Sequence, residues 1–178
     1  MNWLTDFVKP KLNSLVNRKD PPSDLWTKCG CGERMLYVSD LKENLHVCSY
    51  CDQHMYIDFE SRFKQLFDDE KFELIEIPIE NNDPLKFKDL KKYTDRLKDA
   101  QQKTKQKDAA HVATGQIGGT TICIFLLDFK FMGGSMGQYV GEAFKIGCQK
   151  AVELNCPFIS IASSGGARMQ EGLVSLMQ

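Results

Sequence analysis

Four cysteines near the start of the chain have the residue type and spacing of a metal site. They are Cys29, Cys31, Cys48 and Cys51. A structural zinc ion takes four thiolate or imidazole ligands in a tetrahedron, commonly as two pairs on separate turns. Cys48 and Cys51 have the usual two-residue spacer, and sixteen residues separate Cys31 from Cys48, as in many zinc ribbons. The stretch therefore predicts one structural Zn²⁺ held by all four cysteines.

The first cysteine pair departs from this pattern because only Gly30 separates its members. A single spacer strains chelation by both thiolates, although glycine tolerates backbone angles that relieve the strain. If Cys31 is not a ligand, His46 or His54 is the alternative. A disulfide framework is the other interpretation, and it requires an oxidising compartment. Four protein ligands leave no open coordination position, so the zinc is expected to hold the fold and not to catalyse.

Two glycine-rich loops suggest a second kind of chemistry. Gly165 and Gly166 follow the apolar segment 157–163 and precede an expected helix, a position that exposes backbone N–H groups. Gly133 and Gly134 repeat the arrangement after the preceding apolar segment. Such N–H groups stabilise the negative oxygen that develops when a thioester forms an enolate. Neither loop matches a phosphate-binding loop, the dinucleotide fingerprint or the nucleophile elbow of serine hydrolases, so those three chemistries are unfavoured.

The elements that must position these loops follow the order of an α/β protein. Residues 111–129 predict two strands joined by a turn at Gly118 and Gly119, and the second strand is apolar enough to be buried on both faces. A helix over 137–155, a short buried strand over 157–163 and a last helix after the second glycine loop are expected next. Because few strands are present, we expect an α/β core that is incomplete at its C-terminal side.

Three segments precede this core, which spans 111–178. Residues 1–24 predict a short amphipathic helix and a tether, and residues 25–57 the zinc ribbon. Residues 58–110 predict a connecting region of helix, strand and helix. Its last part, 84–108, is rich in lysine, and its apolar stripe at helical spacing is Leu90, Tyr93, Leu97 and Ala100. The lysines are either a solvated helix face or a contact for an anionic ligand such as the phosphates of CoA.

The composition fits a globular protein, with 42% hydrophobic and 26% charged residues. A net charge of −1 gives no bulk attraction for nucleic acid. No apolar run approaches the ~20 residues needed to cross a membrane, and a secretory signal is not apparent. We therefore expect a cytoplasmic protein. In a reducing compartment the scattered Cys123, Cys148 and Cys156 are expected to be small core residues.

Five segments, taken in order, resemble the beta subunit of bacterial acetyl-CoA carboxylase carboxyltransferase: LWTKC, ENLHVCSYCDQHM, LKFKDLKKYTDRLKDAQQKT, DFKFMGGSMG and SSGGARMQEG. The resemblance covers nearly the whole chain, and FMGGSMG and SGGARMQEG are its most specific parts. It implies a crotonase-like fold. It also implies transfer of a carboxyl group from carboxybiotin, on a carrier protein, to acetyl-CoA, which gives malonyl-CoA for fatty acid biosynthesis.

The resemblance further implies site residues and partners. It places oxyanion-stabilising amides at Gly165 and Gly166 and a wall of the CoA site at Gly133 and Gly134. The implied partners are a carboxyltransferase alpha subunit in an α2β2 assembly, biotin carboxyl carrier protein and biotin carboxylase. The family's pattern continues past Gln178. Two alternatives stay open: a nucleic-acid-binding module built on the ribbon, and a carboxyltransferase for another acyl-CoA such as propionyl-CoA.

Overall fold

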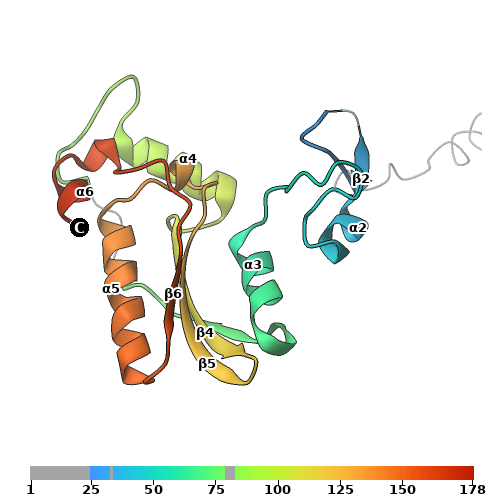
Figure 1. Ribbon diagram of the computed structural model, residues 1–178. Coiled ribbons are helices and arrows are strands. Elements are labelled where there is room, and N and C mark those ends of the chain that lie inside the picture. Colours follow the sequence, from blue (N-terminus) through green and yellow to red (C-terminus); the bar gives the residue numbers. More distant parts are fainter. Residues whose placement is uncertain (1–24, 33, 79–82) are drawn as a thin grey trace, which may run out of the picture. The chain divides into compact units, whose positions relative to one another are not determined.

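The computed structural model describes residues 25–32, 34–78 and 83–178. The chain divides into two compact units, Met1–Ile57 and Asp58–Gln178. The helix and tether expected for residues 1–24 lie outside the described residues (Figure 1). In the described part of the chain, no helix is long and apolar enough to cross a membrane.

The first unit is a small cysteine-containing module, which we call the cysteine module (residues 25–57). Strands β1 (Trp26–Lys28) and β2 (Met35–Tyr37) pair antiparallel, and helix α2 (Val38–Glu43) follows directly. Its buried cluster contains Cys29, Leu36, Leu41 and Cys48. Because two of these four are cysteines, the apolar core is too small to hold the module folded without a further link.

The second unit is built on a four-stranded mixed sheet in the order β3-β4-β5-β6. Its first three strands are antiparallel, and β6 runs parallel to β5. The strands are β3 (Phe72–Leu74), β4 (Ala110–Ile117), β5 (Thr120–Leu127) and β6 (Phe158–Ile161). The expected turn between β4 and β5 is confirmed. Gly118 and Gly119 have φ of 58° and 74° there, and their N–H groups donate to the Asp68 carboxylate.

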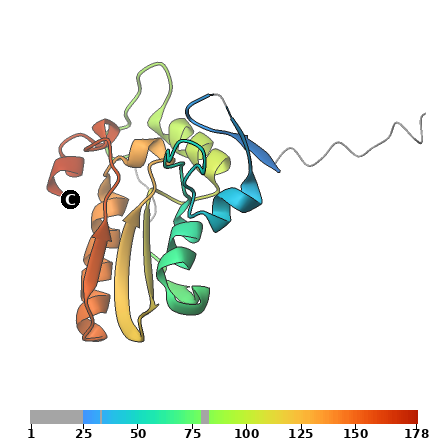
Figure 2. The same ribbon diagram turned by 45° about the vertical axis from the view of Figure 1, so that its right-hand side comes forward.

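Helices cover both faces of this sheet (Figures 1 and 2). Helix α3 (Phe59–Leu66) lies on one face, and α5 (Gln138–Glu153) lies on the other with α4 (Tyr93–Thr104). Alternate residues of β5 enter the two cores. Ile122, Ile124 and Leu126 join Phe63 and Phe67 of the α3 side, whereas Cys123, Phe125 and Leu127 join Tyr139, Val140 and Ala143 of the α5 side. The prediction that this strand is buried on both faces is confirmed.

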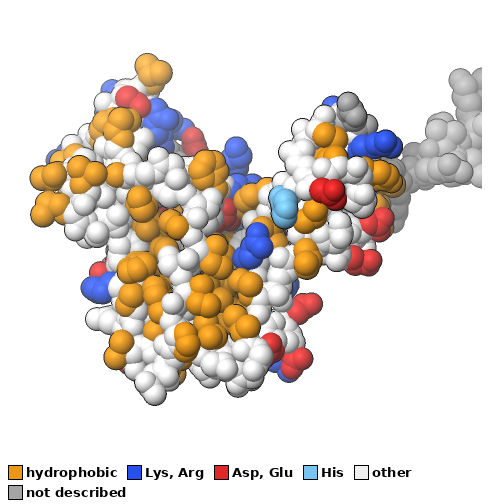
Figure 3. All heavy atoms as spheres, viewed as in Figure 1, with side chains coloured by type: hydrophobic (Ala, Val, Ile, Leu, Met, Phe, Trp, Pro, Cys, Tyr) orange, Lys and Arg blue, Asp and Glu red, His pale blue; other side chains and the backbone are white. Residues whose placement is uncertain are grey.

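The expectation that the strand within 157–163 is buried was wrong. In β6, Ile159 and Ser160 are exposed, and Phe158 and Ile161 are only partly buried. Among the described strands β6 is the last in the sheet, and Figure 3 shows hydrophobic side chains gathered over it and the adjacent side of α5. A hollow of ≈ 440 Å³ on this side is lined by Phe125, Met136, Val140, Phe144 and Ala162, among others.

The expected helical stripe in the lysine-rich segment was partly wrong. Helix α4 begins at Tyr93, so Leu90 lies before it and is fully exposed. Tyr93 and Leu97 are buried as expected. The turn before the helix is fixed instead by Asp89, whose carboxylate accepts from Lys91 N–H and pairs with Arg96. Charged side chains of this segment therefore pair with each other along its solvated face.

His111 of β4 makes the fold sensitive to acid. Its ring stacks on Phe59, with centroids 3.6 Å apart, and burial lowers the His111 pKa to about 4, against the opposing effect of Asp128 and Asp108. The unfolded chain binds a proton near pH 6.5, while the folded state stays neutral until about pH 4. The stability that the folded state gains by keeping His111 neutral is therefore complete above pH 6.5. It is lost as the pH drops from 6.5 towards 4.

We predict that the free energy of unfolding falls less in His111→Phe than in the wild type between pH 7 and pH 4.5. At 1.36 kcal/mol per pKa unit, the difference is about 2 kcal/mol. Urea unfolding at the two pH values, followed by circular dichroism, measures it. Equal losses in the two proteins would show that His111 does not cause the acid sensitivity.

Candidate functional site

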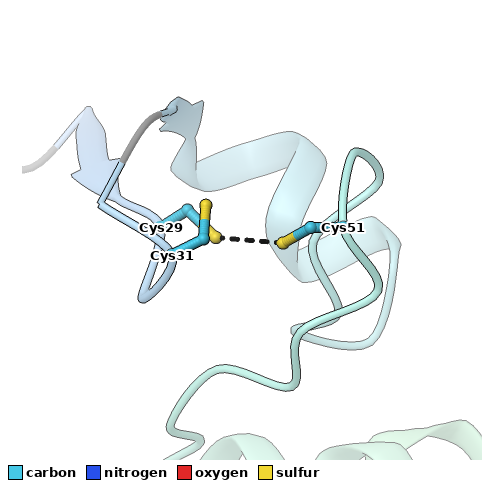
Figure 4. Close-up of side chains that lie close together, drawn as sticks. All are labelled: Cys29, Cys31 and Cys51. Atoms are coloured by element: carbon cyan, nitrogen blue, oxygen red, sulfur yellow. Dashed lines mark hydrogen bonds between the residues drawn. The ribbon is translucent and has the colours of Figure 1, made fainter.

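The cysteine module brings three of the four predicted metal ligands together. The sulfur atoms of Cys29, Cys31 and Cys51 lie within 4.8 Å of one another (Figure 4). Cys29 Sγ and Cys51 Sγ are 3.5 Å apart. Cys29 and Cys31 come from the turn after β1, and Cys51 comes from the second cysteine pair. Two turns far apart in sequence thus present thiols to one point, which is the geometry a tetrahedral metal ion requires.

Cys48 is fully buried, and its thiol interacts with those of Cys29 and Cys51. The backbone N–H of Tyr50 is the largest influence that lowers the Cys48 pKa; the N–H of Cys51 and the thiols of Cys29 and Cys51 add to it, against burial. The N–H of Cys31 acts likewise on Cys29, but burial and the neighbouring thiols raise the Cys29 pKa to about 12. Such a cluster releases its protons when a divalent cation supplies positive charge.

The histidine alternatives receive less support. The Nδ1 atom of His46 lies 3.2 Å from the Tyr56 carbonyl oxygen. His54 forms an isolated bridge with Val47. Within the described residues, the cluster of possible ligand atoms contains sulfur and no imidazole. The chemistry of this donor set fits zinc.

The two glycine loops of the second unit are joined by backbone hydrogen bonds. Gly165 N–H donates to Gly133 O at 2.8 Å, Met136 N–H donates to Gly166 O at 2.9 Å, and Arg168 N–H donates to Met136 O at 2.8 Å. The first loop contains the 3-10 turn Met132–Gly134 after β5, and the second loop follows β6. The predicted site residues of both loops therefore lie side by side at the carboxyl ends of two parallel strands.

The expectation that a helix follows Gly166 directly was wrong. Residues after Gly166 run extended beside Met136, then form a 3-10 turn (Met169–Glu171) and the short helix α6 (Val174–Met177). The amides of the loop consequently have local acceptors. Gly165 N–H is used in the bond to Gly133, and Gly166 N–H donates to the exposed Ser164 Oγ at 3.0 Å. Of these two donors, only Gly166 has an acceptor that can rotate away.

Gly134 is required by the contact between the loops. Its φ is +63°, and a Cβ atom there would overlap the Ser163 carbonyl oxygen. Gly133 has a similar φ of +68°, but the nearest atom to an added Cβ is 4.0 Å away. A side chain at Gly134 would therefore cause both a backbone clash and backbone strain, whereas a side chain at Gly133 would cause only the strain.

We predict that Gly134→Ala destabilises the second unit by about 3 kcal/mol, while Gly133→Ala costs about 1 kcal/mol. The first substitution must push the two loops apart, and the second only strains one φ angle. Urea unfolding of the two variants measures the difference. Equal losses would contradict the close approach of the loops.

A buried polar network, which no sequence pattern predicted, lies beneath the loops. The Arg168 guanidinium pairs with Asp108 through two hydrogen bonds of 2.7 Å and lies 3.5 Å from Glu171. Tyr93 OH donates to Glu171 Oε1 at 2.6 Å, and burial raises the pKa of Tyr93. The only signal in the sequence was an arginine and an acid three residues apart within SGGARMQEG.

The mixed sheet and the joined loops are those of a carboxyl transferase domain. Residues 76–178 match that family, and the chain belongs to it. Within the family, the whole chain is 47% identical to the acetyl-coenzyme A carboxylase carboxyl transferase subunit beta of Jannaschia sp. and 48% identical to that of Dinoroseobacter shibae. The resemblance seen in the sequence is thereby confirmed. The chain spans 56% of the length of each of these two relatives.

A solved structure shares the fold. Transcarboxylase 12S with hydrolysed methylmalonyl-coenzyme A bound is 26% identical, with a TM-score of 0.51 over 65% of this chain and 20% of that one. A second structure of transcarboxylase 12S, with methylmalonyl-coenzyme A and methylmalonic acid bound, gives 25% identity and a TM-score of 0.50. The fold is therefore one that carboxyl transferases use.

Proposed function

We propose that the chain acts as the carboxyl transferase subunit beta of an acetyl-CoA carboxylase. The reaction moves a carboxyl group from carboxybiotin on a carrier protein to acetyl-CoA and forms malonyl-CoA. The identity of 47–48% over the whole chain to proteins of that name supports the proposal. The observation that carries it is the hydrogen-bonded pair of glycine loops at the ends of β5 and β6, because it holds in place the Gly166 N–H, whose acceptor is the exposed Ser164 hydroxyl.

The loops' part in the reaction is electrostatic. The acetyl methyl carbon loses a proton and gains the carboxyl group, and negative charge develops on the thioester oxygen in between. We assign the stabilisation of that charge to the Gly166 N–H, because its present acceptor is the exposed Ser164 hydroxyl. Gly165, whose N–H is bonded to Gly133 O, holds the shape of the oxyanion loop, and Gly133 and Gly134 form the wall for CoA. Carboxybiotin, when bound, supplies the carboxyl group and a ureido nitrogen that takes up the proton.

The cysteine module has a structural role in this proposal. Cys29, Cys31, Cys48 and Cys51 would hold one Zn²⁺, and the module would be a zinc ribbon. The converging sulfur atoms support this, as do the N–H groups that lower the pKa of Cys48. The second unit would be part of a crotonase-like core. An alpha subunit in an α2β2 assembly, biotin carboxyl carrier protein and biotin carboxylase are the proposed partners.

The reverse reaction tests the proposal. The chain in its full-length form, combined with the alpha subunit, would be assayed for malonyl-CoA decarboxylation that depends on free biotin as the carboxyl acceptor. Activity that requires both subunits is expected. A folded, zinc-loaded assembly without activity would overturn the proposal, and a nucleic-acid titration would then test the ribbon as a binding module.

A further inference from the structure

We infer that Arg168 is a positioning residue that fixes the two glycine loops relative to each other. Its backbone belongs to the second loop, where its N–H bonds to Met136 O. Its side chain reaches into the first loop, where Nη2 donates to Ser135 O at 2.8 Å and Nε donates to Ser135 Oγ at 3.1 Å. One residue therefore holds both loops, by its backbone and by its side chain.

The guanidinium is itself held by groups outside the loops. Asp108, which precedes β4, accepts from Nη1 and Nη2 at 2.7 Å each. Tyr93, the first residue of α4, accepts from Nη1 at 3.2 Å. Together with the two bonds to Ser135, all five N–H donors of the guanidinium have acceptors. Arg168 is fully buried. Its hydrogen bonds to Asp108 and Tyr93 connect the two loops to the start of β4 and the start of α4.

Glu171 extends the same network to helix α5. Its Oε1 atom accepts from Tyr93 OH at 2.6 Å, and its Oε2 atom accepts from Gln138 N–H at 2.6 Å, at the first residue of the helix. Asp108 and Glu171 carry two negative charges against the single positive charge of Arg168. The positive end of the α5 helix dipole partly offsets the remaining negative charge. A Cβ atom at Gly137 would overlap the Glu171 carboxylate, so glycine there keeps the approach open.

A lysine cannot replace this arrangement. Its ammonium has three donors around one point and cannot serve Ser135 O, Ser135 Oγ and both Asp108 oxygens together. The charge would be kept, but the first loop would lose its fixed position. Misplacement of a catalytic group by about 1 Å costs on the order of 100-fold in rate, so the effect on turnover should be large. This consequence for turnover, unlike the anchoring itself, rests on the proposed function.

The test compares Arg168→Lys with Arg96→Lys, which makes the same change in the exposed ion pair with Asp89. Amide hydrogen exchange in the full chain is the first readout. We expect the Gly165 N–H, which is bonded to Gly133, to exchange at least about 10-fold faster in Arg168→Lys, while Ile124 in β5 keeps its wild-type rate. Ser135→Ala, which removes one bond and no charge, should give a smaller increase of the same kind.

Turnover in the complete assembly is the second readout. We expect kcat for carboxyl transfer to fall by about 100-fold in Arg168→Lys, with the KM for acetyl-CoA changed less than about threefold, because the Gly166 N–H is assigned to act on the transition state. Arg96→Lys should keep both values. A purely structural role would lower the amount of active enzyme, which is corrected by measuring folded protein, and would leave kcat per folded molecule unchanged.

The outcomes separate the two claims. Unchanged exchange at Gly165 in both Arg168→Lys and Ser135→Ala would overturn the anchoring role. If Arg168→Lys does not fold, Ser135→Ala alone decides, and wild-type exchange there overturns the inference. If Gly165 N–H exchanges faster in Arg168→Lys but the wild-type assembly has no carboxyl transferase activity, the anchoring role is supported and the proposed function is overturned. Faster exchange with unchanged kcat would overturn the positioning role in catalysis.

Discussion

Asp108→Ala destabilises the second unit by about 3–5 kcal/mol, because it leaves the Arg168 guanidinium buried without its main partner. Both side chains of this ion pair are inaccessible to solvent, and Asp108 also accepts from Ala109 N–H. Two of the five guanidinium donors lose their acceptor. Glu171 at 3.5 Å only partly offsets the charge. The free energy of unfolding in urea measures the loss.

Asp89→Ala is the matched control for this prediction. It removes the carboxylate from the Asp89–Arg96 pair, whose side chains are 38% and 35% exposed. The control also removes the exposed bond from Lys91 N–H, and an exposed pair or bond contributes about 1 kcal/mol or less, so Asp89→Ala should lose much less stability than Asp108→Ala. If Asp108→Ala had the same free energy of unfolding in urea as Asp89→Ala, the buried network would not stabilise the fold.

Cys48→Ala should abolish zinc binding and unfold the cysteine module. Three thiols remain, but the fully buried sulfur that the Tyr50 N–H favours as thiolate is gone. Structural zinc contributes about 10 kcal/mol or more to small modules of this kind, which exceeds what the four-residue buried cluster here provides. Zinc content per chain should fall from one to none, as measured by elemental analysis after dialysis.

Cys148→Ser is the control for the zinc prediction, because Cys148 lies in α5 of the other unit and is only partly buried. It should keep one zinc per chain. A Cys48→Ala chain that retained its full zinc would show that Cys48 is not a ligand. In that case Cys29, Cys31 and Cys51 would need a different fourth partner.

The sequence predicted well those elements whose residues are decided locally. The apolar run of β5 predicted burial on both faces, and the glycine pair at 118–119 predicted a hairpin, because each follows from a short pattern. The burial of β6 was not predictable in this way. An apolar run such as Phe158–Ile161 indicates that a strand is able to be buried. Whether the strand is in fact buried depends on which other segments cover it.

The network beneath the loops was beyond sequence patterns for a related reason. Arg168 and Asp108 are 60 positions apart, and Tyr93 and Glu171 are 78 apart. No periodicity connects such residues, and arginine and aspartate are usually exposed. The glycines that form the loops were identified because loop geometry requires glycine itself. Their hydrogen-bond partners were not identified, because the pairing arises only when β5 and β6 lie side by side.

Forward transfer of labelled carboxyl from carboxybiotin to acetyl-CoA tests the role of the Gly166 loop in catalysis. It compares Gly166→Val with Gly119→Val in the complete assembly. Both glycines have positive φ, of 117° and 74°, and neither has an atom within 4 Å of an added Cβ, so both substitutions strain the backbone without a clash. We predict that Gly166→Val loses turnover with zinc content unchanged, while Gly119→Val, in the β4–β5 turn, stays active. Full activity of a folded Gly166→Val enzyme would contradict the assignment of the oxyanion-stabilising amide to this loop.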